Sequence, residues 1–319
     1  MYRLYILYKI YIFLGKNYIY CNCVNHRGDT SMEKPDRTHW FLPHAILTML
    51  LIAVITTSLF GSGCIDSKNA GQVVKLQIAG STTVLPIAEE CARVFMEKHP
   101  GSQIYVSGGG SSHGIRSVAD GTVDIGDASR DLKDSEREKY PDLVTHAIAK
   151  DGVAVVVHPE NEISDLTLEE LQGIYTGEIT NWKDLGGEDS EIMVVSREEG
   201  SGTRDCFEQV VLNPIKKEVT DRAIIQDSNG KMRTTVAGNK KAIGFLSLGY
   251  VNSDVKAVRL DDIEPTIENV RNGRYPITRT LLMITKGEPD EIEQAFLDFV
   301  LSEDGQKIVG AVHFIPVSE

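Results

Sequence analysis

The fold class of this chain is decided by the stretch Arg197-Glu198-Glu199-Gly200-Ser201-Gly202-Thr203, which joins an apolar strand to a helix. Residues 193–196 read as the strand, and Phe207, Val210 and Val211 recur at helical spacing after the turn. A Gly-Ser-Gly-Thr turn at a helix start directs unpaired backbone N–H groups and hydroxyls at one spot, which favours an anion. Arg197 adds positive charge and forked donors that fit a tetrahedral oxyanion. The stretch predicts an α/β fold with an oxyanion site.

Two carboxylates, Glu198 and Glu199, stand inside this stretch, where they would repel a bare anion. A carboxylate fits there if the ligand has a proton to donate, as hydrogen phosphate does and sulfate does not. Adjacent residues on a strand point to opposite faces, so we expect one carboxylate in the site and the other in solvent. The pattern favours phosphate as the ligand over a catalytic pair of acids.

The same local design occurs twice more along the chain. Gly80-Ser81-Thr82-Thr83 follows a predicted strand at residues 73–79, and a glycine-rich turn at residues 108–114, with Ser111, follows a strand at residues 103–107. A single turn of this kind is usually only a helix cap. Three of them at strand–helix junctions are expected to share the sheet edge where ligands bind in α/β folds.

Strand and helix patterns alternate through the rest of the chain. Further strands are predicted at residues 123–128, 153–157, 193–196, 242–246 and 281–285, and a helix at residues 289–309. Such alternation indicates parallel sheets flanked by helices.

The N-terminal part reads as a targeting segment. We expect translation to start at Met32, which makes residues 1–31 an upstream extension and residues 32–63 a signal peptide with an apolar run at residues 41–60. Small residues precede Cys64, so lipid on its sulfur after cleavage is one interpretation, and an uncleaved membrane anchor is the other. Residues 64–72 would be a tether. Both interpretations predict an exported protein anchored to the outer face of the cytoplasmic membrane.

Charge and cysteine content exclude several classes of function. Residues 1–64 hold six of the 33 basic and three of the 46 acidic residues, so the remainder has 27 against 43 and a net charge of −16. This charge argues against nucleic acid and requires that any attraction of an anion be local. Cys91 and Cys206 could form one disulfide, but they lie on different predicted helices, so we expect buried free thiols. No cysteine or histidine spacing suggests a metal site.

No catalytic constellation is apparent. Ser201 is not in a hydrolase elbow, no histidine pairs with it in the pattern, and the glycine-rich turn lacks the lysine of a P-loop. We therefore expect no enzyme activity and no cofactor. Trp182 is expected to pack in the core rather than contact ligand. Ser228-Asn229-Gly230 is either a turn or an added ligand contact, and turn chemistry is the preferred interpretation.

Several motifs together carry a family resemblance. They are Gly80 to Val84, Gly110-Ser111-Ser112, Val123 to Arg130, Arg197 to Thr203, Ile243-Gly244-Phe245, Tyr275 to Thr278 and Phe314-Ile315-Pro316. In this order and spacing they resemble the phosphate-binding proteins of high-affinity phosphate ABC transporters, the PstS type. The resemblance covers nearly everything after residue 72.

The resemblance implies a two-lobed periplasmic-binding-protein type 2 fold, each lobe a mixed sheet flanked by helices, with ligand in the interlobe cleft. Residues 73–152 plus 277–319 would form lobe 1 and residues 153–276 lobe 2, with crossings near residues 150–155 and 275–281. The implied phosphate contacts are Thr82, Thr83, Ser111, Ser129, Arg197, Glu199, Ser201, Gly202 and Thr203. The implied role is a monomeric receptor that delivers inorganic phosphate to ABC permease subunits.

One position departs from the family pattern. Many relatives have an aspartate that accepts the phosphate proton where this chain has Ser129-Arg130, and Asp127 is a possible substitute acceptor on the same strand face. Arg130 could face ligand or form a salt bridge. The alternatives are therefore a receptor for sulfate, molybdate or tungstate, or, from another class, a phosphoester-processing enzyme on the same fold.

Overall fold

The computed structural model describes residues 74–317. The predicted upstream extension, signal peptide, tether and lipid attachment at Cys64 lie outside the described residues. Within the described range, no helix combines the length and apolar character needed to cross a membrane.

The first lobe is built on a mixed sheet with the strand order β2-β1-β3-β11-β4. Its strands are β1 (Val74–Gly80), β2 (Ser102–Gly108), β3 (Ile125–Ala128), β11 (Thr278–Lys286) and the first part of β4 (Leu143–Val157). β1 is parallel to β2 and β3, whereas β11 is antiparallel to β3 and β4. Parallel pairing places the helix-opening turns after β1 and β2 at one edge of this sheet.

Helices cover both faces of this sheet. The helices of the lobe are α2 (Leu85–Lys98), α3 (Ser111–Ala119), α4 (Asp134–Lys139), α9 (Glu291–Leu301) and α10 (Glu303–Ala311). α2, α9 and α10 bury apolar side chains such as Phe95, Phe296 and Val309 in one core. α3 packs Ile115 and Val118 against the opposite face, in a separate cluster.

The second lobe continues the sheet in the order β4-β8-β6-β7. Its strands are β6 (Met193–Arg197), β7 (Ile224–Gln226), β8 (Ala242–Ser247) and the short β5 (Asp165–Leu166), β9 (Lys256–Ala257) and β10 (Arg259–Leu260). Its helices are α5 (Leu168–Thr176), α6 (Gly202–Val211), α7 (Asn229–Ala237) and α8 (Ile267–Arg271). Trp182 is 2% exposed within the core of this lobe, as predicted.

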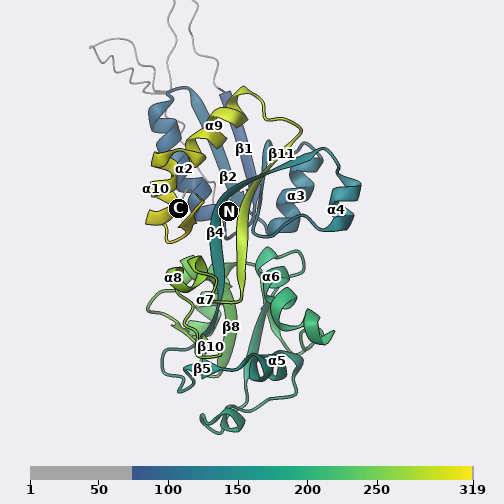
Figure 1. Cartoon of the computed structure of the whole chain (residues 1–319), viewed down its shortest axis with the longest axis vertical. Helices are drawn as coiled ribbons and strands as arrows, with labels where there is room; N and C mark the ends of the chain where they lie inside the picture. The colour runs from purple at the N-terminus through teal and green to yellow at the C-terminus, as the bar shows by residue number, and fades with distance from the viewer. Residues whose placement is uncertain (1–73, 318–319) are drawn as a thin grey trace, which may run out of the picture. The chain divides into compact units, whose positions relative to one another are not determined.

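Two strands connect the lobes. Figure 1 shows β4 and β11 running from the first lobe into the second. β4 pairs with β11 up to Gly152 and then with β8 from Val153 onward, so this one strand belongs to the sheet in both lobes. The chain ends with β12 (Ile315–Pro316), which pairs with β4 at Lys150 and Ala149. The pairing partner of β4 thus changes at residues 152–153, and β11 begins directly opposite, at Thr278.

The prediction of a single helix at residues 289–309 is wrong in one respect, because the structure has two helices there, α9 and α10. Ser302 ends α9 and caps α10, and its hydroxyl accepts a hydrogen bond from the Gly305 backbone N–H at 3.2 Å and donates one to the Phe299 carbonyl at 2.6 Å. The apolar periodicity continues through the break because both helices pack on the same core. Periodicity alone therefore missed a capping serine inside the pattern.

Candidate functional site

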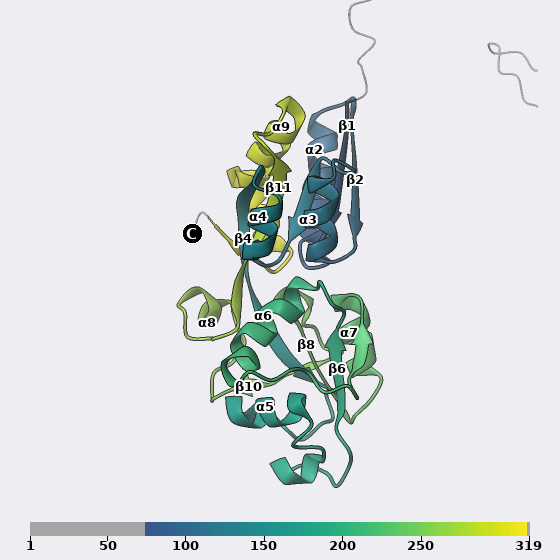
Figure 2. The ribbon, with the colours of Figure 1, turned by 90° about the vertical axis from the view of Figure 1, so that its right-hand side faces the viewer.

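Three helix-opening turns bring hydroxyl groups together between the lobes. Thr83 follows β1, Ser111 opens α3, and Thr203 lies in the first turn of α6. The Thr83 and Thr203 Oγ1 atoms, from different lobes, are 3.3 Å apart, and all three side chains are at most 1% exposed. Figure 2 shows α6 next to the edge of the first lobe. The predicted turns therefore converge on one buried polar cluster.

The turn before α6 approaches the first lobe closely. Gly200 has a φ of +86°, and its carbonyl accepts a hydrogen bond from the Ser112 backbone N–H at 3.0 Å. A Cβ atom on Gly202 would lie 2.3 Å from Ser111 Oγ and 2.6 Å from Ser129 Oγ. A side chain at this position would collide with both hydroxyls, so only glycine permits the approach. Ser201 caps α6 by accepting from the Arg204 backbone N–H at 3.3 Å.

Ser129 belongs to the same cluster. Its backbone N–H donates to Ser111 Oγ at 3.0 Å, and the two hydroxyl oxygens are 3.3 Å apart. Ser129 therefore contributes a hydroxyl to the interlobe cluster.

Arg197 is a buried cation at the carboxyl end of β6, with 1% exposure. Its Nε and Nη2 atoms pair with the Glu198 carboxylate at 2.8 and 3.0 Å, and Nε also donates to the Gln226 carbonyl at 3.1 Å. The buried Nη1 has no hydrogen-bond partner among the described residues. A buried N–H without a partner is costly, so this donor is suited to an anionic ligand.

The structure does not support Glu199 as the carboxylate of the site. Glu199 is exposed, whereas Glu198 holds Arg197 and lies beside Gly110 of the first lobe. Of the two adjacent carboxylates, Glu198 is therefore the one turned toward Arg197 and the first lobe, and Glu199 is the exposed one. The positive φ of Gly200 bends the chain directly after Glu199, and strand alternation could not anticipate this bend.

Asp127 is buried, and neither of its carboxyl oxygens has a hydrogen-bond partner within residues 74–317. Burial raises the pKa of this carboxyl well above its ordinary value. Asp127 lies on β3, two residues before Ser129, and its backbone carbonyl accepts a hydrogen bond from the Ser81 N–H at 2.9 Å. The described contacts do not connect its carboxyl group to the hydroxyl cluster, so its role as a proton acceptor stays a prediction.

Arg130 forms salt bridges, which decides between the two roles left open by the sequence. Its guanidinium pairs with Glu136 at 2.7 Å within the first lobe and with Asp205 at 2.7 Å on α6 of the second lobe. Lys133 Nζ adds a 3.0 Å contact to the same Asp205. Ion pairs therefore join the two lobes at this point.

Two residues of the cluster were missed from the sequence. Asn229 is fully buried, and its Nδ2 donates to Thr83 Oγ1 at 2.9 Å and to Thr82 Oγ1 at 3.3 Å. For Ser228-Asn229-Gly230 the sequence left a turn or an added ligand contact open, and the turn was preferred. A helix start after a strand of the same sheet, like the other three junctions, was the available signal.

The second missed residue is Arg279 on β11. Its guanidinium donates to Ser129 Oγ, Thr203 Oγ1 and Thr83 Oγ1 at 3.2, 2.9 and 3.0 Å, and to the Asp151 carboxylate on β4. Burial raises the pKa of Asp151, and Arg279 opposes that shift. Arg279 lies between two threonines and outside the strand predicted at residues 281–285, so no local pattern marked it as part of the site.

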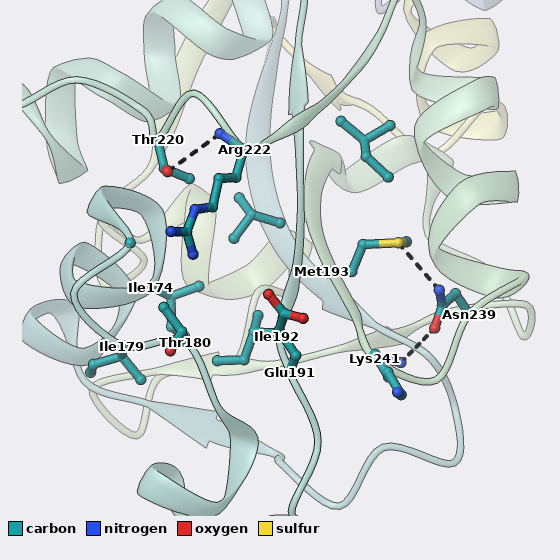
Figure 3. Close-up of a pocket in the computed structure, with 13 residues that line it drawn as sticks. Ile174, Ile179, Thr180, Glu191, Ile192, Met193, Thr220, Arg222, Asn239 and Lys241 are labelled. Atoms are coloured by element: carbon teal, nitrogen blue, oxygen red, sulfur yellow. Dashed lines mark hydrogen bonds between the residues drawn. The ribbon is translucent and has the colours of Figure 1, made fainter.

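A separate pocket of about 300 Å³ lies in the second lobe, as Figure 3 shows. Ile192, Met193, Arg222 and Lys241 are among the residues that line it. It lies at the start of β6, whereas the hydroxyl cluster lies at the end of that strand. Ligands of open α/β sheets bind outside the carboxyl ends of strands, which favours the cluster as the functional site.

Metal and thiol chemistry receive no support from the described residues. No group of acidic, histidine or cysteine side chains in residues 74–317 could hold a metal ion. Cys91 and Cys206 are buried free thiols, as predicted, and burial raises their pKa values to about 12 and about 11.

Comparisons with known proteins place the chain in a family. Residues 66–304 match the model of the PBP superfamily domain. The phosphate-binding protein PstS of Bacillus subtilis is 37% identical over 246 residues, covering 76% of this chain and 81% of that protein. This chain belongs to the PstS family. PstS of Borreliella burgdorferi is 29% identical over 279 residues, covering 84% of this chain and 98% of that protein.

Solved structures agree with this family assignment. A Clostridium perfringens protein, named as a candidate phosphate ABC transporter substrate-binding protein and crystallised with phosphate, shares 45% identity with a TM-score of 0.73. The match covers 76% of this chain and 99% of that one. An ABC-type phosphate transport receptor from Vibrio cholerae is 36% identical with a TM-score of 0.63, covering 75% and 99% of the two chains. The two-lobed fold expected from the sequence is confirmed.

Proposed function

We propose that this chain captures inorganic phosphate between its two lobes and delivers it to an ABC importer. The observation that carries the proposal is the hydroxyl cluster, to which both lobes contribute and in which Arg279 is buried. An oxyanion enclosed there would meet preorganised donors without exposure to water, where charge-assisted hydrogen bonds are strongest.

The candidate contacts fall into two groups. Hydroxyls and backbone donors come from Thr82, Thr83, Ser111, Ser129, Ser201, Gly202 and Thr203. Positive charge comes from Arg197, whose Nη1 has no partner among the described residues, while Arg279 supplies charge behind the hydroxyls that it contacts. Glu199 is left out of this proposal because it is exposed.

The family supports phosphate as the ligand. The curated relatives are named for phosphate binding, and the Clostridium perfringens structure contains bound phosphate at 45% sequence identity. The same names support an extracytoplasmic receptor that works with a membrane permease. A monomeric state, attachment of the leader to the membrane and the lobe boundaries given above are further parts of this proposal.

A binding role fits the chemistry of the cluster better than catalysis. Ser201 caps a helix, and both described cysteines have raised pKa values, so the described site lacks an activated nucleophile. The family of transport receptors to which the chain belongs agrees with this interpretation.

A second candidate is a receptor for another tetrahedral oxyanion, such as sulfate, molybdate or tungstate. Ser129 stands where the family resemblance implies an acidic residue, and Glu199 is exposed. Asp151, the carboxylate in contact with Arg279, already accepts hydrogen bonds from Arg279 and Ser247. A site with few free acceptors would discriminate weakly against a ligand that has no proton.

Calorimetry of the full chain with phosphate, arsenate, sulfate and tungstate tests these proposals. We expect tight binding of phosphate and arsenate and weak binding of sulfate. Sulfate binding as tight as phosphate would favour the second candidate. Phosphoester turnover that disappears in Ser201→Ala would instead favour an enzyme.

A further inference from the structure

Arg279 occupies an unusual place in the molecule. It lies on β11, one of the two strands that connect the lobes, and its side chain is 3% exposed. Its partners include Thr83 and Ser129 of the first lobe and Thr203 of the second. One guanidinium on a crossing strand therefore reaches hydroxyls that both lobes supply.

The five N–H donors of this guanidinium are all accounted for. Asp151 Oδ2 accepts from Nε at 2.9 Å and from Nη2 at 2.7 Å. The remaining donors reach Thr203 Oγ1 at 2.9 Å, Thr83 Oγ1 at 3.0 Å and Ser129 Oγ at 3.2 Å. Arg279 is thus positioned to act on a ligand through hydroxyl groups, with Asp151 holding its orientation.

The direction of these hydrogen bonds fixes how the hydroxyls can be used. A hydroxyl has one proton and two lone pairs, so an oxygen that accepts from a guanidinium keeps its own proton for another acceptor. Thr83 also accepts from Asn229 Nδ2 at 2.9 Å, which occupies its second lone pair. Thr83 can then only donate, and the adjacent positive charge makes its proton a stronger donor.

Resting on the proposed function, we propose that Arg279 is a positioning residue that orients the hydroxyls of Thr83, Ser129 and Thr203 as donors to the bound oxyanion. These three hydroxyls recognise oxygens without protons. Ser111 and Ser201, which Arg279 does not contact, each accept one backbone N–H and keep a second lone pair that can accept from a protonated oxygen.

A double-mutant cycle on the full chain tests this role. Calorimetry would give the phosphate Kd of wild type, Arg279→Lys, Thr203→Val and the double variant. A lysine keeps the charge but cannot reproduce the forked contacts. We expect Arg279→Lys to weaken binding about tenfold or more, and the second substitution to add less than about threefold, because both remove the same oriented donor.

The matched control cycle pairs Arg279→Lys with Ser201→Ala, since Ser201 is not among the contacts of Arg279. We expect these two effects on the Kd to multiply. Because Arg279→Ala would leave Asp151 buried without its cation, the neutral pair Asp151→Asn with Arg279→Gln serves as a second variant. Thermal unfolding shows which variants fold, and this pair should fold yet bind at least about tenfold more weakly than wild type.

The outcomes separate this inference from the proposed function. If wild type binds none of the four oxyanions, both are overturned. If wild type binds phosphate and Arg279→Lys binds equally well, only the role of Arg279 is overturned. The role of Arg279 would also be overturned if the fold-changes in phosphate Kd caused by Arg279→Lys and Thr203→Val multiply fully in the double variant, as in the control cycle.

Discussion

At the scale of single residues, Arg197 is the donor most directly available to a ligand, because its buried Nη1 has no partner among residues 74–317. Arg197→Ala should raise the phosphate Kd by the equivalent of about 2–5 kcal/mol, since a charge-assisted contact in a closed site is lost. Arg93→Ala is the control, because Arg93 is 54% exposed on α2 and its ion pairs should contribute little. Wild-type affinity in Arg197→Ala would show that the site is misplaced.

The second prediction concerns the effect of Glu199 on sulfate selectivity, for which the structure changes the expected result. The sequence suggested that Glu199 excludes sulfate, but this residue is exposed. Glu199→Gln should therefore leave competition between sulfate and labelled phosphate within about twofold of wild type, as is usual for a surface substitution. Glu198→Gln is the informative comparison, because it removes the partner of Arg197. Sulfate binding by Glu199→Gln alone would restore the original interpretation.

The third prediction is that burial of Asp127 makes the stability of the fold depend on pH. Its folded pKa is raised, so between the ordinary and the raised pKa the folded state keeps a proton that the unfolded state has lost. Stability therefore falls as pH rises through that window. The free energy of unfolding of Asp127→Asn, relative to wild type, should increase from about pH 4 toward pH 8.

Urea denaturation at several pH values would measure this difference, with exposed Asp120→Asn as the control. A difference between Asp127→Asn and wild type that stays constant with pH would mean that Asp127 is ionised in the folded state. The same variant tests the proton-acceptor role, because gain of sulfate binding would place Asp127 in the site.

At the scale of helices and strands, local sequence predicted the elements well and long-range partners poorly. The turns before α2, α3 and α6 were predictable because helix capping depends on a few adjacent residues. Arg279 and its partner Asp151 are 128 residues apart, and Asn229 and Thr83 are 146 apart. No local pattern encodes such a pair, so the second cation of the cluster required the structure.

The break between α9 and α10 gives a prediction at this scale. Ser302→Ala removes the hydroxyl that caps α10 at the Gly305 N–H and should cost about 1 kcal/mol of stability. For a domain of this size the melting temperature should fall by about 2–4 °C. Ser253→Ala, at an exposed position, should leave it unchanged. An unchanged melting temperature for Ser302→Ala would mean that core packing alone sets the break.

At the scale of the whole molecule, ion pairs between the lobes bear on closure around a ligand. Asp205 on α6 contacts Arg130 at 2.7 Å and Lys133 at 3.0 Å, both in the first lobe. A contact made only when the lobes meet stabilises the closed state relative to an open one and slows release of ligand. Asp205→Asn should therefore increase the dissociation rate of phosphate, by about three- to tenfold.

The association rate of phosphate distinguishes an effect of Asp205→Asn on lobe closure from an effect on the local charge. Removing a carboxylate near the site makes the local field more positive, so anion association should stay constant or become faster. Glu208→Gln is the matched control: Glu208 lies on the same helix, is similarly exposed, and pairs with Arg204 within its own lobe. Stopped-flow kinetics at low and high salt should show faster dissociation for Asp205→Asn only, with the difference shrinking as salt screens the pairs. Equal dissociation rates for Asp205→Asn and Glu208→Gln would mean that the hydroxyl cluster and its arginines alone hold the lobes together.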